Sequence, residues 1–303
     1  PGCPVCVTPG EVMDAALELT ERREITLCAY GDMLRVPGTR RGDDLAHRRA
    51  RGASVELVYS PMDALEMAAQ NPGREFVFLG VGFETTAPGT ATAALEARRR
   101  GIKNFSVFSM LKRVEPALRA LIGSEGFAVD AFICPGHVAV ITGAEEFAFL
   151  PREYGLPAAV AGFEPEDILL AIYHLLDMLA QGEPRLVNDY PRAVSAKGNA
   201  LALETMHRAL RPRRDIWRGL GEIEGSGLGL AEELAEFDAE RRFDIRIRPA
   251  EASSPCRCGD VITGRIRPRD CPMFERVCTP DDPLGPCMVS SEGACAAEYK
   301  YAE

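Results

Sequence analysis

The sequence contains no run that approaches the roughly eighteen consecutive apolar residues of a membrane-spanning helix. It also has no excess of positive charge, because 35 lysines and arginines stand against 45 aspartates and glutamates, for a formal net charge of -10. A surface with this balance is poorly suited to the phosphate backbone of a nucleic acid. No charged and apolar leader precedes the first motif. We therefore expect a cytoplasmic protein with no membrane span and no nucleic-acid partner.

Cysteine is the residue type that is unusually placed. With 303 residues, 46% of them apolar, the chain can form two or three domains with ample cores, so it needs no disulfides for stability. Nevertheless, six of its ten cysteines lie in the last 48 residues, namely Cys256, Cys258, Cys271, Cys278, Cys287 and Cys295. In a reducing compartment such a group indicates a thiolate-ligated metal centre or a redox relay, and we expect both.

Strand-like and helix-like segments alternate over the first two thirds of the chain. Strands are predicted at 24–28, 55–59, 76–81, 105–110, 130–134 and 158–161, with helices between them. Phe76–Val81 is nearly all apolar, as expected of a strand buried on both faces of a parallel sheet. This pattern predicts an α/β fold with doubly wound parallel sheets. We expect domains at 1–110 and 111–210, and an irregular cysteine-rich region at 211–303 whose folding depends on metal.

The first motif is the pair Cys3-Pro-Val-Cys6, whose spacing suits a reversible disulfide or half of a metal site. The prolines and the glycine around it predict a shaped turn that presents both sulfurs on one side. The alternative is an incidental pair of small buried residues. Because residue 1 lies inside this motif, we also expect that sequence precedes it in the full-length protein.

Two further motifs follow predicted strands. Glu84 lies in GVGFETTAP and His137 lies in CPGHVAVITG, both at carboxyl ends of strands, where open α/β sheets bind ligands. We predict that they share one cleft edge that faces the Cys3–Cys6 turn, with Glu84 as an acid–base or hydrogen-bonding group and His137 as a proton relay or metal ligand. The structural alternatives are an acid that complements a helix dipole and a capping or core histidine. The GxG turn alone is weak evidence for a dinucleotide site.

The cysteines of the tail can bind zinc or a [4Fe–4S] cluster, since four thiolates suit either. Structural zinc sites usually have two tight C-x-x-C knuckles, and the tail has none. The irregular spacing and the two additional cysteines therefore favour the cluster, with a disulfide-forming pair beside it.

These motifs together resemble the HypD family of [NiFe]-hydrogenase maturation factors, and the resemblance covers the whole chain. It is carried by PGCPVCVTP, GVGFETTAP, CPGHVAVITG and the tail from CRCGD to EGACAA. It implies two related α/β domains and a cluster-bearing region similar to ferredoxin:thioredoxin reductase. In that family the protein is a redox-active scaffold rather than a turnover enzyme. Iron with its cyanide and carbonyl ligands, Fe(CN)2CO, is assembled on it together with a HypC-type chaperone and a HypE-type cyanide donor.

The resemblance also implies roles for individual cysteines. Cys3 and Cys6 are expected to be redox-active, iron-binding thiols, with Cys6 as the direct iron ligand. By similarity to the reductase, Cys258 and Cys287 form a redox pair, and the expected cluster ligands are Cys256, Cys271, Cys278 and Cys295. The competing ligand set is Cys271, Cys278, Cys287 and Cys295.

This sequence lacks one feature of the family, because the upstream CGTH motif has no counterpart before Pro1. Two other functions compete with the scaffold: an iron–sulfur disulfide reductase and a zinc-stabilised interaction protein. The motifs around Glu84 and His137 favour the scaffold, since a simple dithiol relay needs neither residue.

Overall fold

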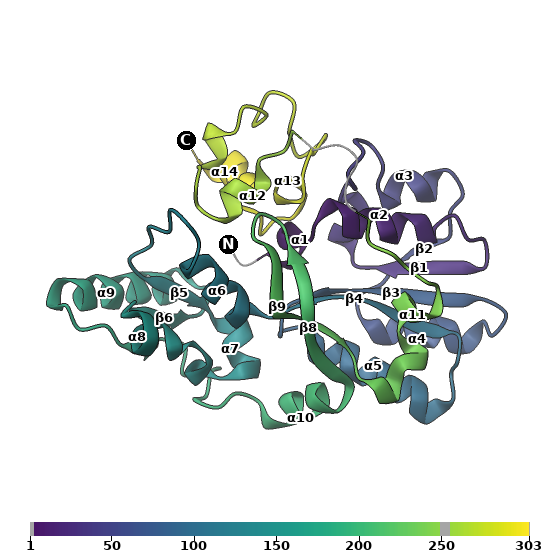
Figure 1. Ribbon diagram of the computed structural model, residues 1–303, viewed down its shortest axis with the longest axis horizontal. Helices are drawn as coiled ribbons and strands as arrows, with labels where there is room; N and C mark the ends of the chain where they lie inside the picture. The colour runs from purple at the N-terminus through teal and green to yellow at the C-terminus, as the bar shows by residue number, and fades with distance from the viewer. Residues whose placement is uncertain (1–2, 249–254, 303) are drawn as a thin grey trace.

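The structure is a computed structural model that describes residues 3–248 and 255–302. Its largest sheet has the strand order β2–β1–β3–β4–β9–β8 (Figure 1). The first four strands in the sequence are parallel: β1 (Ile25–Ala29), β2 (Val55–Leu57), β3 (Glu75–Gly82) and β4 (Phe105–Lys112). Seven of the eight residues of β3 are buried, which agrees with a strand covered on both faces.

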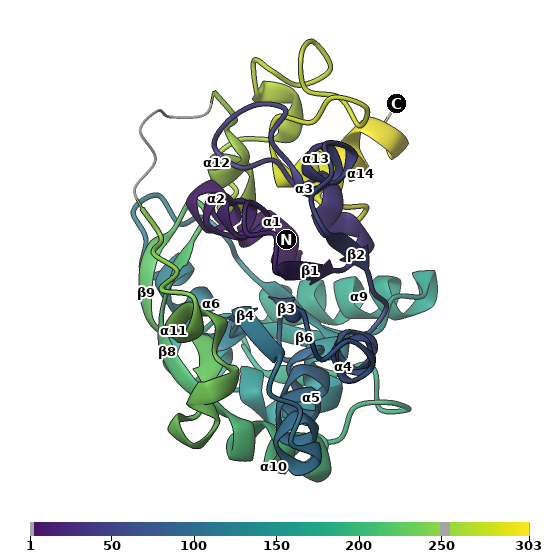
Figure 2. The ribbon, with the colours of Figure 1, turned by 90° about the vertical axis from the view of Figure 1, so that its right-hand side faces the viewer.

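Helices cover both faces of this sheet, as Figure 2 shows. Alternate residues of β3 enter two different cores: Val77 and Leu79 pack with α2, whereas Phe76 and Phe78 pack with α4 and α5. The helices of this part are α1 (Pro4–Val7), α2 (Gly10–Leu19), α3 (Leu45–Ala50), α4 (Pro61–Gln70) and α5 (Ala87–Arg100), with a 3-10 helix at Gly31–Arg35. The doubly wound α/β arrangement predicted from the sequence is therefore confirmed.

Local signals fix where these helices begin and end. Ser60 caps α4 through a reciprocal pair of hydrogen bonds, because its hydroxyl accepts from the Asp63 N–H at 3.2 Å and the Asp63 carboxylate accepts from the Ser60 N–H at 2.9 Å. Gly101 ends α5 in the left-handed conformation, with a φ of 67° that costs glycine little. Both boundaries are thus set by residues at the helix ends themselves.

A smaller second sheet has three parallel strands in the order β5–β6–β7. These strands are β5 (Phe132–Pro135), β6 (Ala158–Ala161) and β7 (Leu186–Asn188). The long helix α9 packs on β6 through Ala171, Leu175 and Met178. The other helices of this part are α6 (Val114–Ile122), α7 (Gly136–Thr142), α8 (Phe149–Tyr154), α9 (Pro165–Gln181) and α10 (Ala200–Ala209), with a 3-10 helix at Ala144–Phe147.

The segment after residue 210 differs from the expectation that the cysteine-rich region begins at 211. Residues of β8 (Leu210–Trp217) and β9 (Gly221–Leu230) form an antiparallel hairpin that pairs with β4 and extends the first sheet. A buried ion pair joins this hairpin to β4, because Lys112 Nζ lies 2.9 Å from Asp215 Oδ2 and also donates to the Ile216 carbonyl oxygen at 2.9 Å. This pair links the hairpin to the carboxyl end of β4.

The chain continues with a 3-10 helix at Glu232–Phe237 and α11 (Ala239–Arg242). Beyond it, residues 255–302 form a separate small lobe that lies against α1 and α2 in both views (Figures 1 and 2). This cysteine lobe consists of loops and short helices: α12 (Cys258–Ile262), α13 (Pro286–Val289), α14 (Ala294–Tyr301) and a 3-10 turn at Pro268–Asp270. Among the helices of the described ranges, none is both long enough and apolar enough to cross a membrane.

Candidate functional site

The predicted cysteine turn is the short helix α1. Cys3 occupies the N-cap position, where its Sγ accepts a hydrogen bond from the Cys6 N–H at 3.1 Å, and Pro4 begins the helix with a suitable fixed φ. A disulfide joins Cys3 to Cys6, with a Cα–Cα distance of 5.3 Å. Only 1% of Cys3 and none of Cys6 is exposed. The two sulfurs therefore lie together, in a site closed to solvent.

The cysteine lobe closes this turn from one side. Helix α1 contacts α12 and α13, which carry Cys258 and Cys287. Cys6 Sγ lies 3.9 Å from the carbonyl oxygen of Pro286, the residue before Cys287. A reduced Cys6 thiol at this position could donate to that oxygen. The structure thus brings the first two cysteines of the chain beside two cysteines of its tail.

The sulfurs of the cysteine lobe form a chain of contacts. Cys258 hydrogen-bonds with Cys256 and with Cys287, and Cys287 also hydrogen-bonds with Cys295. Cys278 lies within electrostatic reach of Cys295 and Cys271, and its Sγ accepts from the Leu284 N–H at 3.4 Å. The two cysteines expected to form the redox pair, Cys258 and Cys287, are therefore in contact, and expected cluster ligands flank them.

These contacts divide the sulfurs by acidity. Hydrogen bonds from Cys256 and Cys287 lower the pKa of the Cys258 thiol well below its ordinary value, with a further contribution from the Arg218 cation. The hydrogen bond to Cys258 is the main cause that raises the pKa of Cys287, and contact with Cys295 adds to it. The lowered pKa favours the thiolate of Cys258 over that of its contact partner Cys287, and the thiolate is the form that attacks disulfides and binds metals.

Two glycines allow the lobe to close around its sulfurs. A Cβ at Gly285 would overlap Cys256 Sγ, and a Cβ at Gly293 would overlap the carbonyl oxygen of Cys287. Any larger residue would therefore push these segments apart. Neither glycine stands out in the sequence, because nothing near it indicates which cysteine it contacts.

The donor chemistry of the lobe fits a thiolate-bound iron–sulfur cluster, since six cysteine sulfurs gather within one small, loop-rich unit. In residues 3–248 and 255–302, no three His, Cys, Asp or Glu side chains form a group that would bind a single metal ion as they stand. The cluster itself, and the four cysteines that would hold it, remain predictions. The remaining cysteines, Cys28 in β1 and Cys134 in β5, are buried in strands of the two sheets.

Arg218, at the tip of the β8–β9 hairpin, is a residue of this site that the sequence analysis missed. Its N–H donates to the Val7 carbonyl oxygen at 2.9 Å, and its guanidinium donates to the Thr8 carbonyl oxygen at 3.1 and 3.0 Å. The next residue, Gly219, packs against Gly259 so closely that a Cβ on either would collide. The hairpin tip therefore holds the cysteine turn and α12 together. The adjacent Trp217 is the only tryptophan in the chain, and its ring stacks on Phe83 with centroids 6.0 Å apart. This single tryptophan was the feature of the sequence that could have drawn attention to Arg218.

Glu84 is buried at the carboxyl end of β3, with 3% of the residue exposed. Its Oε1 accepts a hydrogen bond from the Val114 N–H at 2.9 Å. Val114 begins α6, so its N–H has no acceptor within the helix, and Glu84 supplies one. Within the described residues its Oε2 is buried without a hydrogen-bond partner. Burial raises the pKa of Glu84 to about 7, although the Val114 N–H opposes this shift. Glu84 can therefore hold or release a proton near neutral pH.

Unlike Glu84, which follows a strand of the first sheet, His137 lies in the first turn of α7 beside the second sheet and is exposed. Its ring stacks on Phe163 with centroids 4.1 Å apart. Within the described residues no hydrogen bond or ion pair joins His137 to Glu84 or to the cysteine turn. The cleft edge predicted to be shared by Glu84 and His137 stays a prediction.

Comparison with known proteins identifies the family. A family model described as "HypD: Hydrogenase formation hypA family" matches residues 1–302. The chain belongs to the HypD family. It is 45% identical to the hydrogenase maturation factor HypD of Azotobacter vinelandii, over 99% of this chain and 81% of that protein. It is 44% identical to HypD of Rhodobacter capsulatus and 41% identical to HypD of Escherichia coli K12, each over 99% of this chain and over 81% and 80% of the relative. The family inferred from the sequence motifs is thus confirmed.

Because the pKa of Glu84 is raised, we expect the stability of this HypD-family chain to depend on pH. The contribution of Glu84 to stability is fully present below the ordinary pKa of 4.5 and is lost as pH rises through about 7, because burial disfavours the carboxylate. A shift of this size corresponds to on the order of 3 kcal/mol in the free energy of unfolding. Glu84→Gln keeps an oxygen for the Val114 N–H and should remove this pH-dependent loss.

The measurement is chemical denaturation of the wild type and the variant at several pH values between 4.5 and 8. Glu204→Gln, at an exposed position, is the control and should leave the pH profile unchanged. Parallel pH profiles for the wild type and Glu84→Gln would show that Glu84 is not protonated in the folded protein.

Proposed function

We propose that this chain is a hydrogenase maturation factor that binds iron and supports assembly of the Fe(CN)2CO group of [NiFe]-hydrogenase. In this proposal a [4Fe–4S] cluster resides in the cysteine lobe, and Cys3 and Cys6 are the redox-active, iron-binding thiols. The single observation that supports it most strongly is the position of the Cys3–Cys6 disulfide, buried directly against the helices that carry Cys258 and Cys287. Membership of the HypD family supports the same function. The cytoplasmic location, in which thiols stay reduced, is part of this proposal.

The incoming iron is the cargo, and Cys3 and Cys6 must be reduced before they can bind it as thiolates. Soft thiolate sulfur suits an iron centre that carries cyanide and carbonyl. Cys6 is the proposed direct ligand. Because Cys3 and Cys6 are almost fully buried, water is kept from the bound iron.

Thiol exchange within the chain can supply this reduction. The Cys258 thiolate attacks the Cys3–Cys6 disulfide, which forms a mixed disulfide and releases one thiolate, which takes up a proton. Cys287, in contact with Cys258, then displaces the second thiolate, so that Cys258 and Cys287 are oxidised while Cys3 and Cys6 are both reduced. Restoring the Cys258–Cys287 pair takes two electrons, which a bound [4Fe–4S] cluster would pass on one at a time from an external one-electron donor.

The same burial argues against the rival function of a disulfide reductase that acts on other proteins. Such an enzyme must present a thiol to a substrate disulfide, whereas 1% of Cys3 and none of Cys6 is exposed. The proposal therefore favours a site that works on cargo enclosed by the protein and its partners.

The proposed partners are a HypC-type chaperone and a HypE-type cyanide donor. An apolar face on α9 supports a protein partner, because Leu169, Tyr173 and Leu176 are spaced along one side of the helix and are 61–67% exposed. Side chains of this kind seldom stay in water on a protein that works alone. A partner of this kind would bury this face.

The proposed function can be tested by complementation of a bacterial strain that lacks its own HypD. The full-length form of this chain should restore [NiFe]-hydrogenase activity, and Cys6→Ala should abolish it. Cys28→Ala, which removes a buried cysteine from β1, is the matched control and should retain activity. Restoration by Cys6→Ala at the wild-type level would contradict the proposed role of the turn.

A further inference from the structure

An arginine-lined pocket lies at the edge of the first sheet opposite the cysteine turn. Its volume is about 790 Å³, and its lining comes from the segments that precede β1, β2 and β3. Two glutamates line it, Glu21 and Glu56, against six arginines: Arg22, Arg23, Arg48, Arg49, Arg51 and Arg74. On a chain with a net charge of -10, this local excess of positive charge needs an explanation.

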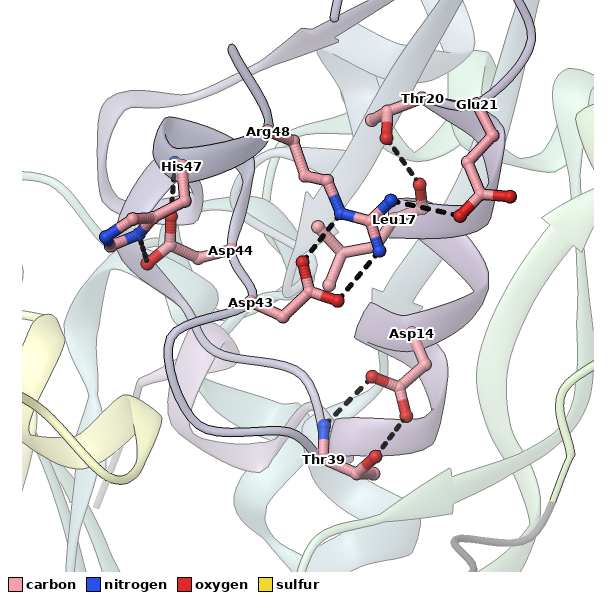
Figure 3. A network of polar contacts seen from close by, with 9 residues as sticks. All are labelled: Asp14, Leu17, Thr20, Glu21, Thr39, Asp43, Asp44, His47 and Arg48. Carbon is pink, nitrogen blue, oxygen red and sulfur yellow. Dashed lines mark hydrogen bonds and ion pairs between the residues drawn. The ribbon is translucent and has the colours of Figure 1, made fainter. Parts of the chain in front are cut away.

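The protein neutralises only part of this charge. Arg48 forms a two-pronged ion pair with Asp43, at 2.6 and 2.8 Å, and contacts Glu21 at 3.0 Å (Figure 3). Arg49 lies 3.7 Å from Glu56. By contrast, the side chains of Arg23 and Arg51 make no hydrogen bond or ion pair within the described residues. At least these two guanidinium groups are available to a ligand.

Two more arginines are held in place by neutral groups. Arg22 donates to the Phe243 carbonyl oxygen at 2.9 Å. Arg74 donates through Nε to Thr26 Oγ1 at 3.1 Å and through Nη2 to the Arg23 carbonyl oxygen at 3.2 Å. These bonds hold both guanidinium groups without an acidic partner, so their charges are not neutralised by a carboxylate.

A helix dipole explains only some of these arginines. Arg48, Arg49 and Arg51 lie at the C-terminal end of α3, where cations are favourable whether or not a ligand binds. Arg22 and Arg23 lie beyond the C-cap of α2, and Arg74 lies beyond that of α4, outside the last helical turn, where the effect of the dipole has fallen off. Arginines from three separate segments line one pocket, and this convergence indicates a binding site for an anion.

The lining also indicates the class of ligand. Guanidinium groups bind phosphate and carboxylate through paired hydrogen bonds. Because none of the described residues that line the pocket is aromatic, a nucleotide base would find no ring among them to stack on. A hydroxyl donor is present as well: Thr26 and Ser54 share a hydrogen bond at 2.9 Å, and Thr26 can donate it while accepting from Arg74, which leaves the Ser54 proton for a ligand.

We propose that this pocket is a binding site for a compact polyanion that carries two or more phosphate or carboxylate groups. The site is separate from the proposed iron site, because the pocket adjoins the C-terminal end of α2 while the cysteine turn precedes its N-terminal end. The proposal therefore does not depend on the proposed function.

The test is calorimetric titration of the full chain with pyrophosphate and, separately, with citrate, at low ionic strength. Arg23→Ala/Arg51→Ala removes two cations whose side chains form no hydrogen bond or ion pair within the described residues, so it should fold normally. Lys197→Ala/Arg208→Ala removes the same charge from exposed positions outside the pocket and is the matched control. The pocket variant should bind at least about tenfold more weakly than the wild type, and the control should bind like the wild type.

The two ligands distinguish the source of the anion. Binding of pyrophosphate alone would assign the site to phosphate groups, and binding of citrate alone would assign it to carboxylates. Added salt should weaken either complex, because the attraction is between charges that solvent reaches. The proposal is overturned if neither anion binds, or if both double variants bind as the wild type does.

Discussion

Replacing Cys271 by alanine is expected to remove bound iron, acid-labile sulfide and the broad visible absorbance of an iron–sulfur cluster from the protein. Cys271 belongs to both of the ligand sets considered, and a cluster with three thiolates in place of four is held poorly. Residues 255–302 consist of short helices and loops, and four of their buried side chains are cysteines, so loss of the cluster should also loosen this lobe. The measurement is metal and sulfide analysis with a visible spectrum on anaerobically purified variants.

Cys134→Ala is the matched control, since Cys134 is buried in β5 outside the cysteine lobe. It should keep the full spectrum. The same assay separates the two ligand sets, because Cys256→Ala should remove the cluster and Cys287→Ala should keep it. A cluster that survives in Cys256→Ala and is lost in Cys287→Ala would favour the competing set.

Replacing Cys258 by alanine should leave the cluster in place and stop reduction of the Cys3–Cys6 disulfide. In the proposed exchange the low-pKa Cys258 thiolate makes the first attack, and the buried disulfide is otherwise shielded from reductants. The rate of reduction should therefore fall to the background rate of the reductant alone. Alkylation of free thiols followed by mass spectrometry of the N-terminal peptide measures this directly.

Cys134→Ala again provides the control and should reduce the disulfide as the wild type does. The result that contradicts the relay is normal reduction in Cys258→Ala. Loss of the visible spectrum in this variant would have a different meaning, since it would make Cys258 a cluster ligand.

Much of the fold could be predicted because its signals are local. The buried strand at 76–81 and the strand at 158–161 are each encoded within a few residues, and both are confirmed. The β8–β9 hairpin was missed because glycines interrupt its alternating pattern. A Cβ at Gly227 or Gly229 would crowd the side chain of Asp215 or Arg213 on the partner strand. The reason for these glycines therefore lies in another segment of the chain and cannot be read from the local sequence.

The site could be predicted in part for the same reason. Spacing and motif identify the cysteines of the turn and of the tail, but no local pattern shows that Cys6 packs against Pro286 or that Arg218 binds the Val7 and Thr8 carbonyl oxygens. These contacts join segments more than 200 residues apart. They arise from the packing of the hairpin tip and the cysteine lobe around α1.

The most direct test of the account is the metal content of the wild-type protein, purified without oxygen. Iron, acid-labile sulfide and zinc are measured per chain, together with the visible spectrum before and after reduction. The account predicts iron and sulfide in the equal ratio of one [4Fe–4S] cluster, with an absorbance that bleaches on reduction. Stoichiometric zinc with no acid-labile sulfide would contradict it.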